Sequence, residues 1–303
     1  MISKLSTEQL KALCDIAIKA AQQAGQWIEK VDHNTLQRNF KNVGSNEASQ
    51  LVTEVDIASE DIIRRFLQKL PGQLDIAFVG EESASSNCNH ARGRFEKSWF
   101  WCVDPLDGTL AFVEGRFGYA VSIALVEKSG KPLIGVVYDP ARQILYHAIA
   151  GQGSYCDLRP FSRTDEKSQE TSKVLTVYAD ASFKTHASYD MAVKALENCA
   201  HALDFNDLTF SYGNGAVKNA CDVLGSTNAC YLKLPKKEDG GGSIWDYAAT
   251  SCIAHESGAW ASDSYGQILA LNRRDSTFMN HKGILFASNT LLAKCIIDAL
   301  WHS

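Results

Sequence analysis

The spacing of hydrophobic residues along the chain predicts helices first. Ser6 and Gln9 have the spacing of a capping box, and apolar residues then recur at helical intervals as far as Ile28. The polar stretch over residues 32–50 is typical of a turn or flexible connector. The pattern predicts a second helix over about 57–70, which a Pro-Gly pair ends.

Strand-like segments follow these two helices. Apolar runs rich in β-branched and aromatic residues predict strands over 76–79, 99–103, 119–126 and 133–138. Turn formers between the last two runs predict that they pair as an antiparallel meander. After a polar interruption over 159–173, the pattern predicts strands over 174–178 and near Tyr231, and helices over 189–203, 216–225 and 245–255. We place a domain boundary at the interruption, between an N-terminal α+β part, 1–158, and a C-terminal α/β part, 159–303.

Composition excludes several classes of protein. The 303 residues carry 30 basic and 35 acidic side chains, a net charge of −5, and 45% are hydrophobic, which is typical of a soluble globular protein. The absence of a long basic run argues against binding to nucleic-acid polymers. No stretch approaches the ~18 consecutive apolar residues of a membrane span, and the start of the chain lacks a signal-peptide core. Nine scattered cysteines without a Cys-x-x-Cys pair indicate reduced thiols, so we expect a cytoplasmic protein.

Two acidic clusters stand directly after predicted strands. Glu81 and Glu82 follow the first strand, and Asp104 and Asp107 follow the second. Carboxylates packed at strand ends repel one another unless a cation compensates them. Their oxygen donors favour a hard divalent ion such as Mg²⁺ over zinc. The clusters therefore predict a metal site.

The residues between the two aspartates support this interpretation. Pro105 prevents a regular strand ladder from continuing, so the backbone turns and brings Asp104 and Asp107 toward one point, with the Leu106 carbonyl between them. Gly108 permits a tight turn and leaves backbone N–H groups uncovered. The same residues taken alone are also typical of a surface turn.

A third acidic position precedes the predicted helix over 245–255. Asp246 follows a glycine run, and a carboxylate at the start of a helix is also typical of a simple cap. Four motifs then stand in order along the chain: Val52-Thr53-Glu54-Val55-Asp56, Gly80-Glu81-Glu82-Ser83, Asp104-Pro105-Leu106-Asp107-Gly108-Thr109 and Trp245-Asp246-Tyr247-Ala248-Ala249.

This ordered set resembles the inositol monophosphatase superfamily of Mg²⁺-dependent, lithium-sensitive phosphatases, and the match covers nearly the whole chain. The resemblance implies an α+β fold, a layered αβαβα sandwich of the inositol-monophosphatase/fructose-1,6-bisphosphatase type. It also implies a homodimer that hydrolyses a small phosphorylated metabolite with metal-activated water.

The resemblance assigns roles residue by residue. The implied ligands of two or three Mg²⁺ ions per site are Glu81, Asp104, Asp107, Asp246 and the carbonyl of Leu106. The implied catalytic residues are Thr109, Asp56 and Glu82, of which Thr109 and Asp56 orient and activate the attacking water. Exposed N–H groups near Gly108 and Thr109 are expected to hold phosphate oxygens.

The substrate is less clearly indicated. Lys233 stands where inositol phosphatases usually carry a glutamate, and with Lys218 it resembles the 3'(2'),5'-bisphosphate nucleotidase branch, in which cations bind a second phosphate. Gly215 departs from that branch, which often has a serine there. Both lysines are equally typical of a solvated surface. We favour a nucleotidase that converts 3'-phosphoadenosine 5'-phosphate to AMP, with an inositol-1-monophosphatase or a binding or regulatory module as alternatives.

Overall fold

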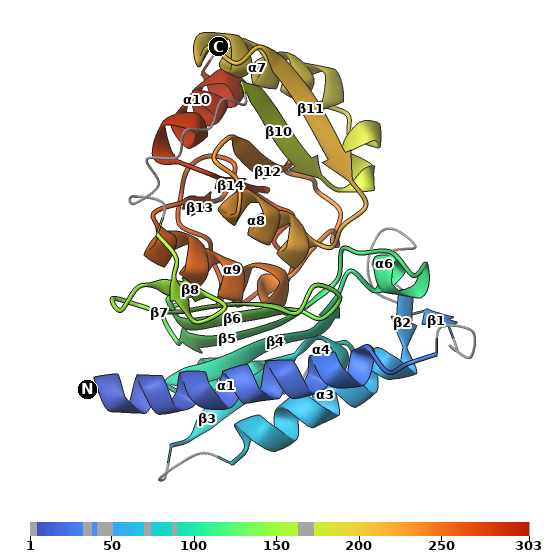
Figure 1. Cartoon of the computed structure of the whole chain (residues 1–303), viewed down its shortest axis with the longest axis vertical. Helices are drawn as coiled ribbons and strands as arrows, with labels where there is room; N and C mark the ends of the chain where they lie inside the picture. The colour runs from blue at the N-terminus through green and yellow to red at the C-terminus, as the bar shows by residue number, and fades with distance from the viewer. Residues whose placement is uncertain are drawn as a thin grey trace.

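The protein is a stack of alternating helical and sheet layers (Figure 1). The computed structural model describes residues 5–32, 38–40, 51–69, 74–86, 90–162 and 173–302. From one end of the stack to the other, the layers are helices α1 and α3, a seven-stranded sheet, helices α8 and α9, a five-stranded sheet, and helices α7 and α10. This order confirms the predicted αβαβα sandwich.

The elements have the following bounds. The α-helices are α1 (Thr7–Ile28), α3 (Glu54–Leu67), α4 (Glu81–Ser86), α5 (Gly93–Glu96), α6 (Thr109–Val113), α7 (Tyr189–Ala202), α8 (Ala216–Leu224), α9 (Ile244–Ser257) and α10 (Thr290–Trp301). The strands of the first large sheet are β3 (Ile76–Gly80), β4 (Trp99–Asp107), β5 (Ala120–Glu127), β6 (Pro132–Asp139), β7 (Ile144–Ile149), β8 (Ser154–Cys156) and β9 (Arg159–Pro160). Those of the second are β10 (Val174–Ala179), β11 (Asp207–Tyr212), β12 (Ala229–Lys233), β13 (Trp260–Ser262) and β14 (Ile284–Ala287). A short pair, β1 (Arg38–Phe40) and β2 (Leu51–Thr53), and the 3-10 helices His90–Arg92 and Ala181–Thr185 complete the described elements.

The first large sheet is covered on both faces, which explains its sequence. All nine residues of β4 are buried, and β5 is buried except at its last residue. The sequence of a strand that is covered by helices on both faces is a continuous run of apolar residues, because the side chains on neither face contact water. Side chains of α1 and α3 pack on one face and those of α9 on the other. The sheet therefore holds the end of β4 rigidly between two layers.

The second large sheet has the strand order β11-β10-β12-β14-β13. Strand β10 is parallel to both of its neighbours, whereas β14 is antiparallel to β12 and β13. Helices α7 and α10 pack on its outer face. Helices α8 and α9 lie between the two sheets, so their first turns face the end of β4 (Figure 1).

Most predicted elements are present, with shifted ends. The capping box at Ser6 and Gln9 forms, since each residue's side chain accepts a hydrogen bond from the other's backbone N–H. Helix α3 begins at Glu54, three residues earlier than predicted, which places Asp56 in its first turn. Strand β4 continues past its predicted end, and its register with β5 shifts between Asp104 and Asp107, where Pro105 cannot join a regular ladder.

Several expectations need correction or lie outside the described residues. Strand β1 lies within the stretch predicted to be a connector, and the remainder of that stretch, 33–37 and 41–50, lies outside the described residues. Strand β9 pairs with β8, so residues 159–160 belong to the first sheet. Most of the polar interruption, residues 163–172, also lies outside the description, and the domain boundary there stays a prediction.

Two further findings concern the described residues as a whole. None of the helices in the described ranges is long and apolar enough to cross a membrane. Eight of the nine cysteines are described and all eight are free thiols, while Cys88 lies outside the description.

Gly135 tests the packing of the first sheet against α9. A Cβ atom at this position of β6 would lie 2.3 Å from the Ala249 carbonyl oxygen and 3.0 Å from the Cys252 Cβ. We expect Gly135→Ala to lower the free energy of unfolding by about 1–3 kcal/mol, as overpacking of a core does. Gly225→Ala is the matched control, because its Cβ has no contact shorter than 3.7 Å. Urea unfolding of both variants measures the difference, and equal effects contradict the described packing.

Candidate active site

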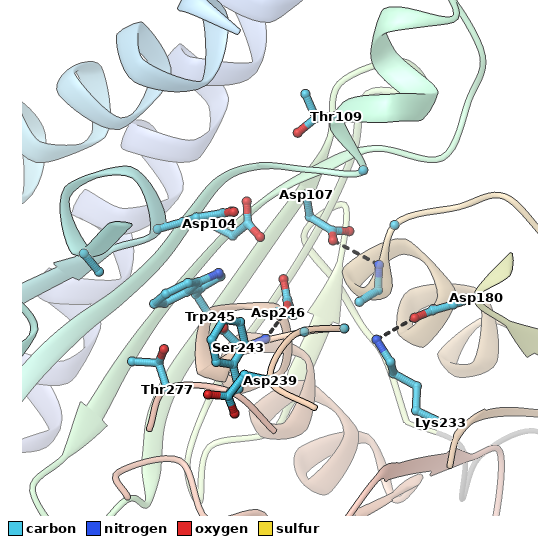
Figure 2. Close-up of a pocket in the computed structure, with 18 of the residues that line it drawn as sticks. Asp104, Asp107, Thr109, Asp180, Lys233, Asp239, Ser243, Trp245, Asp246 and Thr277 are labelled. Carbon is cyan, nitrogen blue, oxygen red and sulfur yellow. Dashed lines mark hydrogen bonds and ion pairs between the residues drawn. The ribbon is translucent and has the colours of Figure 1, made fainter. Parts of the chain in front are cut away.

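Three aspartates from two elements converge at the edge of the first sheet. Asp104 and Asp107 come from β4, and Asp246 comes from the first turn of α9 (Figure 2). Each offers a carboxylate oxygen within 4.8 Å of the others, and all three side chains are buried. The structure thus brings these three predicted residues together, and their role as metal ligands stays a prediction.

The start of α8 fixes the position of Asp107. Its two carboxylate oxygens accept hydrogen bonds from the backbone N–H groups of Ala216 (3.0 Å) and Val217 (2.8 Å). These N–H groups have no partner within the helix, and the helix dipole favours a negative charge there. A Cβ at Gly215 would lie 2.2 Å from Asp107 Oδ2, which explains why this chain has glycine where serine was expected for the nucleotidase branch.

Backbone N–H groups also orient the other two carboxylates. The Ser243 N–H donates to Asp246 Oδ2 at 2.5 Å, so Asp246 belongs to a helix cap as well as to the cluster. The Leu106 N–H donates to Asp104 Oδ1 at 3.1 Å. The interpretation of Asp246 as a helix cap is thus confirmed, and its role as a metal ligand stays a prediction.

Burial and mutual repulsion make the ionised cluster unfavourable by itself. Burial, followed by the charge of Glu81, raises the pKa of Asp246 to about 6. Burial raises the pKa of both Asp104 and Asp107 well above the usual range, and the neighbouring carboxylates add to the effect. A divalent cation is the natural compensation for such a set, and the all-oxygen donors suit a hard ion.

Thr109 and Asp56 form a second arrangement beside the aspartates. The Thr109 hydroxyl lies 2.9 Å from Asp56 Oδ1 and 3.1 Å from the Leu106 carbonyl oxygen, and it donates to either acceptor. Gly108 precedes it with φ +83°, and a Cβ there would lie 2.5 Å from the Gly118 carbonyl oxygen, so only glycine fits the turn. The structure therefore joins the first and third motifs through a side-chain hydrogen bond.

The second motif is placed by a residue that the sequence analysis did not single out. Glu60, a buried residue of α3, accepts hydrogen bonds from the N–H groups of Glu82 (2.8 Å) and Ser83 at the start of α4. Glu81 lines the cavity beside the aspartates. Glu82 is half-buried and is not among the residues that line the cavity, so its catalytic role stays a prediction.

A cavity of about 1140 Å³ opens over the carboxylates and extends between the two halves of the chain. Asp104, Asp107 and Asp246 line it together with Gly108, Thr109 and Lys233. Lys233 Nζ lies 2.5 Å from Asp180 Oδ2 (Figure 2). The sequence analysis did not identify Asp180, although it follows strand β10 directly, as Glu81 follows β3.

The two lysines of the sequence analysis have different surroundings. Burial lowers the pKa of Lys233, but Asp180 and the groups of Tyr247 and Asp246 outweigh it, so the net pKa is raised. Lys218 does not line the described cavity. Its ammonium pairs with Asp222 one turn along α8 and lies 3.9 Å from Asp139 Oδ2. The predicted contact between Lys218 and a second phosphate therefore has no support in the geometry.

The raised pKa of Asp246 predicts how stability depends on pH when no metal is bound. The pKa is 3.8 for an ordinary aspartate and about 6 in the folded protein, so the folded state binds more protons between these values. The free energy of unfolding then falls by about 3 kcal/mol as the pH rises from about 4 to 7.

Asp246→Asn removes this titration, so we expect the variant to gain stability relative to the native chain over the same range. Urea unfolding of the chelator-treated proteins at pH 4.5 and pH 7 measures the effect. A difference between variant and native chain that is equal at both pH values contradicts the assignment.

Comparison with known proteins agrees with this geometry. The model of the inositol monophosphatase family matches residues 9–303. The chain is 31% identical over 262 residues to inositol monophosphatase 3 of Solanum lycopersicum, covering 86% of this chain and 89% of that one. It is 27% identical over 270 residues to the 3'(2'),5'-bisphosphate nucleotidase CysQ of Shigella flexneri, covering 88% and 97%.

A solved structure has the same fold. The SuhB protein of Bartonella henselae superimposes with a TM-score of 0.67 at 22% identity, over 96% of this chain and 98% of the other. The family model spans almost the whole sequence, and the four motifs lie where the geometry brings their side chains together. The chain therefore belongs to the inositol monophosphatase family, whose members hydrolyse phosphate monoesters.

Proposed function

We propose that the protein is a Mg²⁺-dependent phosphatase of a small soluble phosphate ester that carries a second phosphate, with 3'-phosphoadenosine 5'-phosphate as substrate and AMP as product. The observation that carries the metal-dependent reaction is the convergence of three buried aspartates within 4.8 Å beneath a large cavity. Inositol 1-phosphate is the alternative substrate, since the chain is similar both to inositol monophosphatases and to a bisphosphate nucleotidase.

The residues present fit a magnesium site. Asp104, Asp107 and Asp246 would hold the ions, with Glu81 and the Leu106 carbonyl as further donors. These are all oxygen ligands, and two or three divalent ions would offset the repulsion that raises the carboxylate pKa values. When bound, Mg²⁺ neutralises charge on the phosphate and lowers the pKa of water.

Thr109 and Asp56 would accept the proton of the attacking water. When the Thr109 hydroxyl donates to Asp56, its oxygen presents lone pairs toward the cavity and accepts a proton from a water placed there. Asp56 is buried and in turn accepts the hydroxyl proton. The pair thus orients and activates the attacking water, and no covalent intermediate is required. The turn at Gly108 leaves backbone N–H groups near the phosphate oxygens.

The size and charge of the cavity support a bisphosphate. About 1140 Å³ exceeds what a monophosphorylated sugar ring needs and is ample for a nucleotide. Five cations line it, of which Lys233 and Arg116 already pair with carboxylates, so a second phosphate would meet cations outside the carboxylate cluster chiefly at Arg92, Arg94 and Arg274. A purely binding or regulatory role is less favoured, because only a metal offsets the cost of keeping these carboxylates buried together.

Removal of one carboxylate tests the metal site. In the native chain, Mg²⁺ at a hundred times its Kd should raise the free energy of unfolding by about 2.7 kcal/mol. Asp104→Asn and Asp107→Asn should abolish this stabilisation and lower turnover by about a hundredfold or more, with the fold intact. Thermal unfolding with and without Mg²⁺ measures the stabilisation, phosphate release measures turnover, and circular dichroism checks the fold. Asp190→Asn, on the exposed surface of α7, is the control. Undiminished Mg²⁺ activation in either site variant refutes the assignment.

A comparison of substrates tests the specificity. Phosphate release with Mg²⁺ from 3'-phosphoadenosine 5'-phosphate should exceed release from inositol 1-phosphate by about tenfold or more in kcat/KM, since only the former offers a second phosphate to the cationic lining. The measurement is made on the native chain with both substrates in parallel. A preference for inositol 1-phosphate selects the alternative function.

A further inference from the structure

One buried cation of the cavity wall lacks a counterion. Arg94, on the short helix α5, has a side chain that is only 3% exposed and lines the cavity. Its Nη2 donates to the Arg273 carbonyl oxygen at 2.9 Å, but Nε and Nη1 have no hydrogen-bond partner among the described residues. A buried guanidinium without a carboxylate is unfavourable unless a ligand supplies the negative charge.

The surroundings of Arg94 are cationic and aromatic. Its guanidinium lies 4.5 Å from the centroid of the Phe95 ring, and the guanidinium of Arg274 lies 5.9 Å from the same ring. Arg92 also lines this end of the cavity. Within the part of the chain that the structure describes, none of Arg92, Arg94 and Arg274 forms an ion pair. We call these three residues the arginine end of the cavity.

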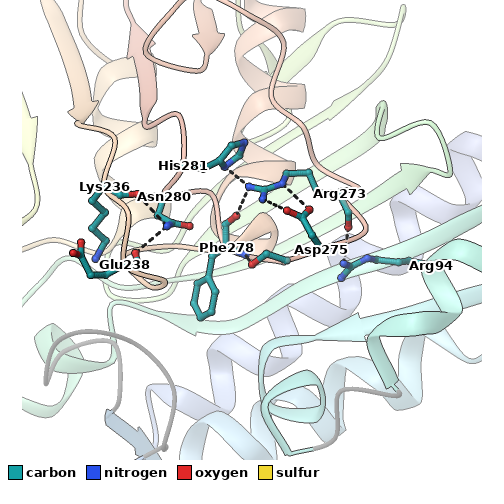
Figure 3. Close-up of polar contacts among 9 residues, drawn as sticks. Arg94, Lys236, Glu238, Arg273, Asp275, Phe278, Asn280 and His281 are labelled. Atoms are coloured by element: carbon teal, nitrogen blue, oxygen red, sulfur yellow. Dashed lines mark hydrogen bonds and ion pairs between the residues drawn. The ribbon is translucent and has the colours of Figure 1, made fainter.

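The segment that carries Arg274 is held firmly in place. The Arg273 guanidinium binds Asp275, the Phe278 carbonyl oxygen and His281, and Figure 3 shows the Arg94 side chain pointing toward this segment. The Asn272 amide donates to the Lys128 carbonyl oxygen at 2.8 Å, which ties the same segment to the first sheet. The backbone that carries Arg274 is therefore fixed, and Arg94 is anchored to it through the Arg273 carbonyl oxygen.

The opposite side of the carboxylate cluster differs in charge. Asp180 and Lys233 lie on one side of Asp246, whereas Trp245 and Thr277 lie on the other (Figure 2). The ammonium of Lys233 is already neutralised by Asp180 at 2.5 Å. A second anion placed against Lys233 would have to meet the Asp180 carboxylate as well. Among the acids that line the cavity next to these arginines in the sequence, Asp275 is already paired with Arg273, and Glu96 is set against three arginines.

We propose that the arginine end binds the second phosphate of the substrate, that is, the one that is not hydrolysed. This inference rests on the proposed function and assigns a specificity site within it. A phosphate accepts several hydrogen bonds from a guanidinium group in a fixed planar geometry, so at this end it would bind the exposed Arg274 and would compensate the charge of the buried Arg94. The substrate class is a phosphate monoester whose alcohol part carries another phosphate.

The test compares two substrates with the same bond to be hydrolysed, 3'-phosphoadenosine 5'-phosphate and 3'-AMP, in the presence of Mg²⁺. The native chain should prefer the former, and Arg274→Ala should reduce the ratio of the two kcat/KM values by about tenfold. Arg94→Met should do the same. Because Arg94 is buried, the exposed Arg274 keeps the test valid if the Arg94 variant does not fold.

Binding provides a second readout. AMP retains the second phosphate, and calorimetry should show that Arg274→Ala weakens AMP binding by about the same factor while adenosine binding is unchanged. Arg65→Ala, an exposed arginine of α3 outside the cavity, is the matched control and should change neither quantity. Lys233→Ala decides between the two sides of the cavity, since we expect it to lower both kcat/KM values equally.

Each result has one meaning. Two results overturn the assignment of the second phosphate to the arginine end: Arg274→Ala loses activity equally on both nucleotides, or only Lys233→Ala loses the preference for the bisphosphate. In either case the protein is still a Mg²⁺-dependent nucleotide phosphatase. A native chain that shows no preference for the bisphosphate over 3'-AMP also overturns it. If the native chain releases phosphate from neither nucleotide, the proposed function fails, and the inference fails with it.

Discussion

The repulsion among three buried aspartates is the constraint on which the site depends. Burial and mutual proximity raise the pKa values of Asp104, Asp107 and Asp246, so the folded chain must hold them in place against a tendency to separate or to take up protons. Backbone N–H groups do this for each carboxylate, from the turn after Asp104, from the start of α8 and from the cap of α9. The layers of the sandwich bring these three local structures to one point, and the carboxylates thereby remain ready for cations.

The cavity divides the tasks of a phosphatase between regions of different charge. In the proposed function, the carboxylates and the Thr109–Asp56 pair would serve the phosphate that is hydrolysed, and both come largely from residues before 158. The rest of the substrate would then lie between the ion pair of Lys233 with Asp180 and the arginines of the opposite wall. Under this proposal the reaction chemistry and the choice of substrate depend on separate groups of residues, so one fold could act on different esters.

Sequence reasoning located the carboxylates because each follows a strand or begins a helix, and such positions are readable from local patterns. The layered fold followed from the four ordered motifs. Strand β11 was not predicted, because its half-buried and exposed residues give little hydrophobic signal. Long-range support, such as Glu60 for α4, has no local signature. The pairing of Lys218 with Asp222 was readable, because the two residues lie four apart on one helix face, and it contradicts a free surface lysine.

The hydrogen bonds from the start of α8 to Asp107 connect residues that are synthesised at very different times. The N–H donors at the start of α8 come 109 and 110 residues after Asp107 in the chain. Helix α9, which packs against Gly135 of β6, comes later still. On the ribosome, the first sheet must therefore wait with one apolar face uncovered until more than a hundred further residues have emerged. While that face is uncovered, the nascent chain exposes apolar surface of the kind that aggregates, so the interval before α9 emerges is the vulnerable stage of synthesis for this layered fold.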